Sequence, residues 1–209
     1  MRDTPTLRAV VFDWGGVLID DPGGDLISYC AERLRVPPSR FAAVFNDHID
    51  AFARGAPEQR FWRDMCADLG MPVPAAPSLW GDAVQAVFRD RPAAWELVRR
   101  LRAQGLRTGF LSNTEPPSMH YFHRRGLGEH FDATVFSCAV GALKPEARIY
   151  ELVLEQLGLP AAAVLMVDDR PENVAGAQDV GMLGHLFIDD AGLDAHLARL
   201  GVSPPARSR

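Results

Sequence analysis

The sequence of 209 residues has little lysine and little cysteine. Only one of its 22 basic residues is a lysine, Lys144, and the other 21 are arginines. The cysteines are Cys30, Cys66 and Cys138, which are odd in number, widely spaced and without a CxxC pair. This usage gives no sign of a disulfide framework. We therefore expect reduced thiols and a cytoplasmic location.

Long apolar runs and basic tracts are also absent. No run approaches the ~20 apolar residues that span a bilayer, and the first apolar stretch stops at Asp13, which is unlike a signal peptide. Against the 22 basic residues stand 27 acidic ones, which gives a net charge of −5 and a pI near 5.7. The composition therefore disfavours general binding to nucleic acids or to a membrane surface.

What is present is the composition of a globular protein, with 47% apolar and 23% charged residues. The length favours one domain, with room for an insertion. Short apolar runs predict strands that are buried on both faces. These runs are residues 7–12, 107–111, 133–136, 163–167 and 183–188.

From residue 92 onward, amphipathic helical patterns alternate with these apolar runs. The helices are expected at 92–104, 116–125, 145–157 and 171–180. Alternation of strands and helices indicates an α/β fold: a three-layer, doubly wound, Rossmann-like core with a mainly parallel sheet.

The alternation is interrupted early in the chain. No strand pattern is found between the first strand and residue 90, and the loops there are rich in proline and glycine. Short helices are expected instead, at 24–34, 39–53, 57–69 and 78–88. We predict a core domain made of residues 1–19 and 90–209, with a helical domain inserted at 20–89.

Polar residues follow several of the predicted strands, at the edge where open α/β sheets bind ligands. Asp13 follows the first strand, Ser112 and its neighbours follow the second, and Asp168 and Asp169 follow the fourth. Lys144 lies in a loop before a helix. Carboxylates that share a crevice repel each other unless a cation lies between them. Oxygen ligands suit Mg²⁺, and the lysine and serine suit an anionic substrate.

Four segments carry a resemblance to a known family. They are FDWGGVL at 12–18, LSNT at 111–114, GALKPE at 141–146 and VDDRPENVAGA at 167–177. In this order and at strand ends, they resemble the four motifs of the haloacid dehalogenase (HAD)-like hydrolase superfamily, in its helical-cap subfamily. Details of the first and third segments look most like the bacterial α-D-glucose-1-phosphatase-like branch.

The resemblance implies a role for several of these residues. Asp13 matches the family's nucleophile, whose carboxylate attacks phosphorus and forms an aspartyl-phosphate. Ser112, with Asn113 beside it, matches the residues that hold the phosphoryl group. Lys144 matches the residue that neutralises the phosphoryl oxygens. A plain structural reading also exists for Ser112, which could cap the helix that follows.

The resemblance also implies a Mg²⁺ site. Asp169 matches a metal ligand, joined by Asp13 and by the backbone carbonyl of Gly15. Asp168 is expected to coordinate directly or through water. Such a metal stabilises charge on the phosphoryl oxygens and orients the attack.

Gly15 departs from the phosphatase pattern, because many phosphatases of the superfamily carry an aspartate there. That aspartate protonates the leaving group and later activates water, work worth ~10²–10⁴-fold in rate. Glycine can do neither. Candidate replacements are Asp20, Asp21, His48 and Glu115, and the spacing selects none of them.

The helical insertion matches the family's α-helical cap, which closes over the nucleophile, excludes water and selects the substrate. Trp14, His48 and Arg54 are candidates to contact the substrate. Each has a plain alternative, because aromatic residues at helical spacing form cores more often and a helix-end arginine is commonly solvated.

These features together predict a Mg²⁺-dependent phosphatase, a monomer or homodimer acting on a small phosphorylated metabolite, a sugar phosphate by its resemblance. One alternative is a 2-haloacid dehalogenase, which uses the same aspartate without a metal. The pair Asp168 and Asp169 speaks against it, because the dehalogenases' fourth motif resembles Ser-Ser-Asn. Another is a phospho-ligand-binding protein that lost turnover through Gly15.

Overall fold

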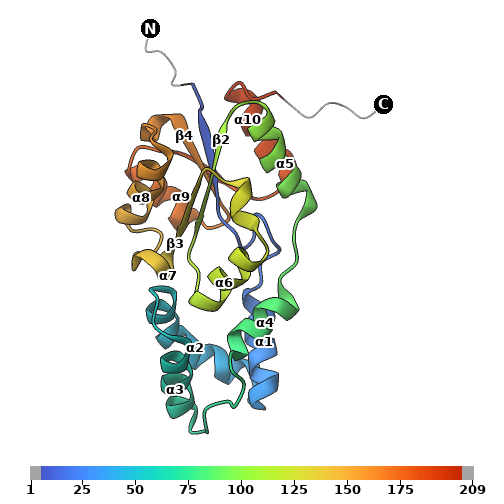
Figure 1. Ribbon diagram of the computed structural model, residues 1–209, viewed down its shortest axis with the longest axis vertical. Coiled ribbons are helices and arrows are strands. Elements are labelled where there is room, and N and C mark those ends of the chain that lie inside the picture. Colours follow the sequence, from blue (N-terminus) through green and yellow to red (C-terminus); the bar gives the residue numbers. More distant parts are fainter. Residues whose placement is uncertain (1–5, 204–209) are drawn as a thin grey trace.

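A computed structural model describes residues 6–203. Its centre is a sheet of five parallel strands in the order β3-β2-β1-β4-β5 (Figure 1). The strands are β1 (Ala9–Phe12), β2 (Arg107–Ser112), β3 (Ala133–Phe136), β4 (Val164–Asp168) and β5 (Leu183–Leu186). Parallel neighbours need a long crossover connection, and helices supply it here.

Helices occupy most of the remaining chain. Those of the early segment are α1 (Gly23–Leu34), α2 (Pro38–Ala53), α3 (Glu58–Leu69) and α4 (Leu79–Val87). Those around the sheet are α5 (Pro92–Ala103), α6 (Pro116–Arg124), α7 (Ser137–Val140), α8 (Ala147–Leu157), α9 (Pro171–Asp179) and α10 (Asp190–Arg199). Two short 3-10 turns span Leu127–His130 and Ala161–Ala163.

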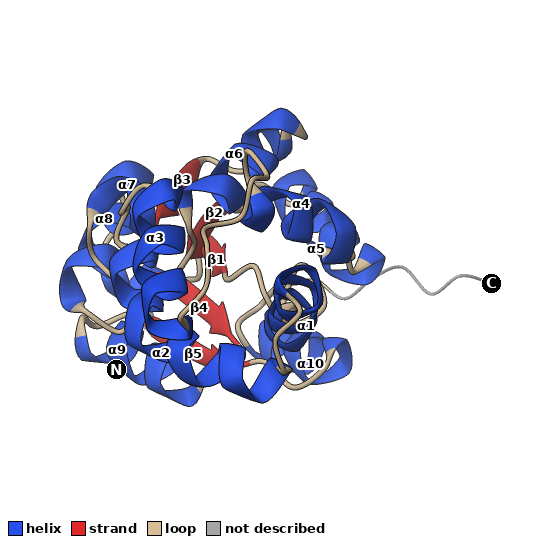
Figure 2. Cartoon of the chain, turned by 90° about the horizontal axis from the view of Figure 1, so that it is seen from below, coloured by secondary structure: helices blue, strands red, loops and turns tan. Residues whose placement is uncertain are grey.

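The two faces of the sheet bury alternate residues of each strand, because successive side chains of a strand point to opposite faces. Val10 and Phe12 of β1 belong to one core cluster, shared with α5, α6 and α10. Ala9 and Val11 belong to another, shared with α8 and α9. Figure 2 shows helices on both sides of the strands, which makes three layers. The predicted doubly wound α/β fold is therefore confirmed.

Helices α1–α4 gather at one end of the molecule, beyond the carboxyl ends of the strands (Figure 1). Their interior is aromatic, with Phe52 stacked on Phe61 at 4.2 Å and Phe45 stacked on Trp80 at 5.4 Å between ring centroids. The chain enters and leaves this group at one place, where Ile19 bridges Asp90. This crossing lies next to the predicted boundaries, and the division into a core domain (1–19 and 90–209) and a helical domain (20–89) stays a prediction.

The structure also contains helices that the sequence pattern did not predict. Helix α10 is short of strongly apolar residues and buries only Leu193 and Leu197. It begins where the side chain of Asp189 accepts a hydrogen bond from the amide of Gly192. The one-turn helix α7 is too short to show a helical period. Among residues 6–203, no helix combines the length and the apolarity that crossing a membrane would require.

Phe110 lies at the centre of the core beside α6, in contact with the rings of Phe122, Phe131, Phe136 and Trp14. Its side chain is fully buried. We expect Phe110→Ala to lower the free energy of unfolding by about 3–5 kcal/mol, because it removes apolar contacts and leaves a cavity. Denaturant unfolding followed by circular dichroism measures the loss.

The matched control is Ile188→Ala, at a side chain that is 78% exposed. It should change stability by no more than about 0.5 kcal/mol. Equal losses in the two variants would contradict the central role of the Phe110 cluster.

Candidate active site

Neighbouring strands bring the predicted site residues to one edge of the sheet. Asp13 follows β1, Ser112 ends β2 and Asp168 ends β4. Strand β1 lies between β2 and β4, so Asp13 has the other two side chains on either side. The amide of Asp13 donates to the carbonyl of Val167 at 3.0 Å, which extends the sheet up to the site. All three side chains are buried.

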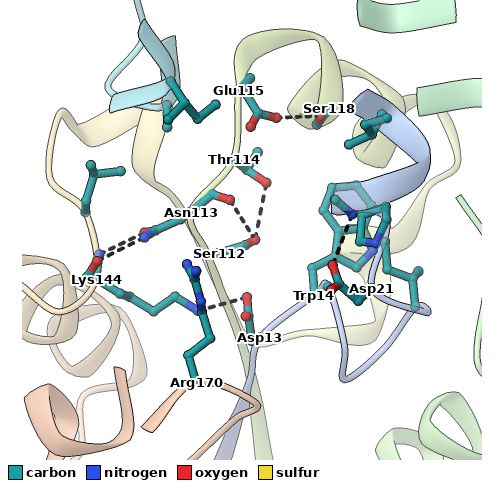
Figure 3. A pocket seen from close by; sticks show the side chains of 18 of the residues that line it. Asp13, Trp14, Asp21, Ser112, Asn113, Thr114, Glu115, Ser118, Lys144 and Arg170 are labelled. Atoms are coloured by element: carbon teal, nitrogen blue, oxygen red, sulfur yellow. Dashed lines mark hydrogen bonds and ion pairs between the residues drawn. The ribbon is translucent and has the colours of Figure 1, made fainter. Parts of the chain in front are cut away.

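Lys144 connects two of the carboxylates. Its Nζ lies 2.8 Å from Oδ1 of Asp13 (Figure 3) and 2.6 Å from Oδ2 of Asp168. The residue is 4% exposed. Burial lowers the pKa of the Lys144 ammonium, but the attraction of Asp13 and Asp168 outweighs it, so the pKa is raised. The lysine is therefore a buried cation at the centre of the site.

Asp13 is held between opposing electrostatic effects. Burial raises the pKa of its carboxyl to about 7; the charge of Asp168 acts in the same direction and that of Lys144 against it. The carboxyl group uses Oδ1 for the lysine. Its other oxygen, Oδ2, has no part in that ion pair.

Asn113 holds the backbone of Lys144 rather than pointing to a free anion position. Its Nδ2 donates to the carbonyl of Lys144 at 3.0 Å, and its Oδ1 accepts from the amide of Lys144 at 2.8 Å (Figure 3). Both ends of the side-chain amide are thus engaged. The side chain therefore fixes the lysine loop, and the phosphate-binding role of Asn113, which lines the cavity beside it, stays a prediction.

Ser112 and Thr114 lie beside Asp13 on the same wall. Their hydroxyl oxygens are 3.2 Å apart, and both residues are buried. The amide of Thr114 donates to Oγ of Ser137. Ser112 therefore has a hydroxyl at the strand end, where the resemblance places the group that holds a phosphoryl oxygen.

Three carboxylates form a group of possible metal ligands. One oxygen each of Asp13, Asp168 and Asp169 can be chosen so that all lie within 4.8 Å of one another. Asp168 is already engaged: Oδ1 accepts from the amide of Arg170 and from Nδ2 of Asn173, and Oδ2 faces Lys144. The more open ligand is Asp169, which is half-buried. Burial, and then the charge of Asp168, raises the pKa of the Asp169 carboxyl.

Gly16 allows Asp169 to approach the loop that carries Gly15. A Cβ on Gly16 would lie 2.2 Å from Oδ2 of Asp169, and the glycine has a φ of +74°. Both facts require glycine there. The sequence motif therefore has a steric reason at Gly16 that is separate from the chemistry of its neighbours.

A cavity of about 460 Å³ adjoins this group of residues. Asp13, Ser112, Lys144 and Asp169 line one end of it, and side chains of α1, α2 and α4 line the other. Gly15 also lines it, so the backbone at the position of the missing acid faces the cavity.

The three residues predicted to contact the substrate are Trp14, His48 and Arg54, and only Trp14 lines the cavity. Trp14 borders the cavity but is only 2% exposed, with its ring packed among Phe88, Phe110 and Phe122. His48 does not line the cavity, and its Nε2 pairs with Asp68 at 2.8 Å. Trp14 and His48 thus take part in packing and pairing within this structure, and their predicted contacts with a substrate stay predictions.

Arg54 also lies outside the cavity lining, but at an informative position. Its guanidinium donates to the carbonyl of Gly141 at 2.9 Å and forms an ion pair with Glu146. Glu146 in turn accepts from the amide of Leu143. Arg54 thus ties α2 to the two ends of the segment that carries Lys144. Its predicted contact with a substrate stays a prediction.

Of the candidate replacements for the missing acid, two line the cavity, Asp21 and Glu115. Asp20 and His48 do not. The cavity also has lining residues that sequence reasoning missed, chiefly Ile27, Phe45 and Ile49. The spacing of four between Phe45, Ile49 and Ala53 marks one face of α2, but the sequence alone does not distinguish a face that meets a cavity from one that packs in a core.

Comparison with known proteins agrees with this geometry. A family model described as haloacid dehalogenase-like hydrolase matches residues 7–181. The chain belongs to this family. The predicted superfamily and the predicted hydrolase class are confirmed, and the glucose-1-phosphatase-like branch stays a prediction.

Relatives within this HAD-like family include phosphatases. The chain is 30% identical, over 93% of its length and 97% of the relative, to a sesquiterpene phosphatase, astK, of Aspergillus oryzae. It is 28% identical, over 90% of its length and 89% of the relative, to a phosphatase, MT3486, of Mycobacterium tuberculosis.

Solved HAD structures share the fold. A HAD enzyme of Bacteroides thetaiotaomicron, in complex with magnesium and inorganic phosphate, has a TM-score of 0.72 at 19% identity, over 90% of this chain and 98% of that one. An L-2-haloacid dehalogenase of Xanthobacter autotrophicus, with chloropropionic acid covalently bound, has a TM-score of 0.62 at 24% identity. The match covers 95% of this chain and 85% of the dehalogenase.

The cluster of Asp13, Asp168 and Asp169 gives a prediction about metal binding that can be tested without an activity assay. Mg²⁺ at 100 times its dissociation constant should raise the melting temperature of the wild type by roughly 5–10 °C. Asp169→Asn removes one charge with little change of shape and should lose most of this shift. Differential scanning fluorimetry with Mg²⁺ and with EDTA measures it.

Asp179→Asn is the control, because Asp179 is exposed at the end of α9. It should keep the full shift. An equal Mg²⁺ shift in all three proteins would place the metal elsewhere.

Proposed function

We propose that this HAD-like hydrolase is a Mg²⁺-dependent phosphatase that hydrolyses a small phosphomonoester through an aspartyl-phosphate on Asp13. The observation that carries the proposal is the buried Lys144 ammonium between Asp13 and Asp168, with Ser112 on the next strand. A nucleophile beside a buried cation and a hydroxyl suits a dianionic phosphoryl group. The relatives named phosphatases, and the magnesium and phosphate bound by the Bacteroides enzyme, support it.

The residues divide the reaction between them. Asp13 Oδ2, the oxygen outside the Lys144 ion pair, attacks phosphorus while the bond between phosphorus and the leaving-group oxygen breaks. Lys144 and Ser112 bind the phosphoryl oxygens and offset the charge on them. Water then cleaves the bond between phosphorus and the Asp13 oxygen, which releases phosphate and restores the carboxylate. The proton that this water loses balances the one that the leaving-group oxygen takes up from solvent.

The donor set fits magnesium. Asp13, Asp169 and the Gly15 carbonyl offer oxygen ligands only, which hard cations prefer. When bound, Mg²⁺ supplies Lewis-acid stabilisation of charge on the phosphoryl oxygens. Asp168 holds Lys144, the Arg170 amide and Asn173, so we assign it to orientation of the site ahead of direct coordination.

The identity of the leaving group is a separate question. The resemblance predicts a sugar phosphate, and the residues considered so far contact only the phosphoryl end of a substrate. The same fold also supports dehalogenation, since L-2-haloacid dehalogenases share it. The adjacent carboxylates Asp168 and Asp169 favour a metal and phosphorus over that alternative.

Removal of the nucleophile tests the proposal. Asp13→Asn should abolish phosphate release from p-nitrophenyl phosphate in Mg²⁺, because a carboxamide is a poor nucleophile at phosphorus. Phosphate release by the wild type should also vanish in EDTA. The control variant Asp179→Asn should keep full activity in Mg²⁺. Unchanged rates in Asp13→Asn or in EDTA would overturn the nucleophile or the metal assignment.

Two outcomes separate the alternatives. Chloride release from 2-chloropropionate, unaffected by EDTA, would favour a dehalogenase. Thermal stabilisation by inorganic phosphate without turnover of any phosphomonoester would favour a binding protein.

The glycine at position 15, where many phosphatases of the family carry a general acid, gives a second test of the proposed reaction. A Cβ on Gly15 would lie 3.3 Å from Cδ of Pro22, so a side chain is accommodated with a small shift of the proline ring. We expect Gly15→Asp to raise kcat for alkyl phosphates by up to ~10²-fold, because it supplies a general acid. The rate with p-nitrophenyl phosphate should change much less, since that leaving group departs without a proton.

Gly15→Ala is the control and should give no gain with either substrate. A gain that is equal for alkyl and nitrophenyl phosphates would contradict the assignment of acid catalysis to this position.

A further inference from the structure

The cavity has a second end, away from the phosphoryl site, and its wall there is mostly apolar. Helix α1 contributes Ile27, α2 contributes Phe45 and Ile49, and α4 contributes Trp80. Ile27, Phe45 and Ile49 are only partly buried, so they keep surface to offer a ligand. Phe45 and Trp80 stack on each other with an angle of 12° between their planes, which makes a rigid aromatic wall.

Polar side chains interrupt this apolar surface: Asn46 and Asp50 of α2, Asp21, Ser118 and Glu115. Of these, Glu115 contacts the aromatic wall directly, through Trp80. It follows β2 and lines the cavity with the side chains of the cap. Both hydrogen bonds that the structure gives its side chain go to Oε2: Trp80 Nε1 donates at 3.2 Å and Ser118 Oγ donates at 3.0 Å. Oε1 takes part in neither bond. In Figure 3, Glu115 and Asp13 lie on opposite sides of Ser112 and Thr114.

The charges of the cavity are divided in the same way. The cationic side chains among its lining residues are Lys144 and Arg170, both placed with the phosphoryl-site residues. The cap end has none. A ligand group that donates a hydrogen bond, above all a cationic one, would find its acceptor at Glu115.

We infer that the leaving group of the substrate is predominantly apolar and carries one hydrogen-bond donor, and that Glu115 receives this donor. The inference rests on the proposed phosphatase function and adds the substrate class of the same site. Glu115 is then the residue that selects among phosphomonoesters of similar shape.

This assignment differs from the sugar phosphate that the resemblance predicts. A sugar would place several hydroxyl groups against Ile27, Phe45 and Ile49, which offer them no partner, and on α2 it would depend on Asn46 and Asp50 alone for hydrogen bonds. Buried polar groups without partners lose affinity. An apolar ring or chain instead gains from leaving water against the same wall.

A set of primary alkyl phosphates tests the inference, because their leaving groups have similar intrinsic reactivity. The set is glucose 6-phosphate, cyclohexylmethyl phosphate, and its 4-(aminomethyl) and 4-(hydroxymethyl) derivatives. Phosphate release gives kcat/KM, and inhibition of p-nitrophenyl phosphate hydrolysis gives the affinity of any compound that is hydrolysed slowly. The amine and hydroxyl derivatives distinguish a cationic donor from a neutral one.

We expect cyclohexylmethyl phosphate to be preferred over glucose 6-phosphate, by kcat/KM or by inhibition. At least one donor-bearing derivative should be better than the parent by about tenfold, the worth of one good charge-assisted hydrogen bond. Glu115→Gln keeps the shape and an oxygen for Trp80 and Ser118, and should lose most of the gain for the amine. The exposed Glu151→Gln is the control and should keep it.

Preference for glucose 6-phosphate, absence of any gain from a donor, or a gain that persists in Glu115→Gln would each overturn the inference. The proposed function fails in a different way, through absence of Mg²⁺-dependent release from p-nitrophenyl phosphate. In that case, displacement of inorganic phosphate by the same compounds, followed by thermal shift, still reads the preference of the cavity.

Discussion

The site depends on a single buried ion cluster, the ammonium of Lys144 between Asp13 and Asp168. Removing these charges from water is costly, and only close pairing in a fixed geometry offsets the cost. The fold supplies that geometry: three adjacent parallel strands fix Asp13, Ser112 and Asp168, and Asn113 clamps the lysine backbone. In a chain that otherwise uses arginine, a compact ammonium fits between two carboxylates where a planar guanidinium would not.

The same cluster is linked to the helices that cover it. Arg54 at the end of α2 binds both Gly141 and Glu146, which flank the lysine loop. Ser137 donates to the carbonyl of Ala53, and Trp80 donates to Glu115. The cap therefore contacts the core at the segments that shape the proposed phosphoryl site, so its position and the geometry of that site are coupled.

The fold could be predicted from the sequence because each strand is a continuous apolar run and most helices have a clear apolar face. Helix α10 was not predicted, because only two of its residues are buried and its apolar residues show no strong helical periodicity. The strand-end residues Asp13, Ser112 and Asp168 could be placed together, since parallel strands end at one edge. Neither the pairing of Arg54 with Glu146 nor that of His48 with Asp68 leaves a pattern, because each joins distant segments through tertiary packing.

The residues that line the cap end of the cavity could not be predicted from the sequence either. Ile27 and Phe45 look like ordinary core residues in sequence, and only the packing of α1 and α2 against the sheet edge leaves part of them exposed. The motifs describe the phosphoryl end because its chemistry is fixed by charge. The other end is formed by surfaces whose orientation depends on the whole fold.

The scarcity of lysine has a consequence for handling the protein. Lys144 carries the sole side-chain amine of the sequence, and the fold hides it beneath the cap. Reagents that acylate or reductively alkylate lysines will therefore find no exposed lysine to modify. Slow labelling of this one amine, followed by mass spectrometry of the 141–150 segment, becomes a reporter of how often the cap opens.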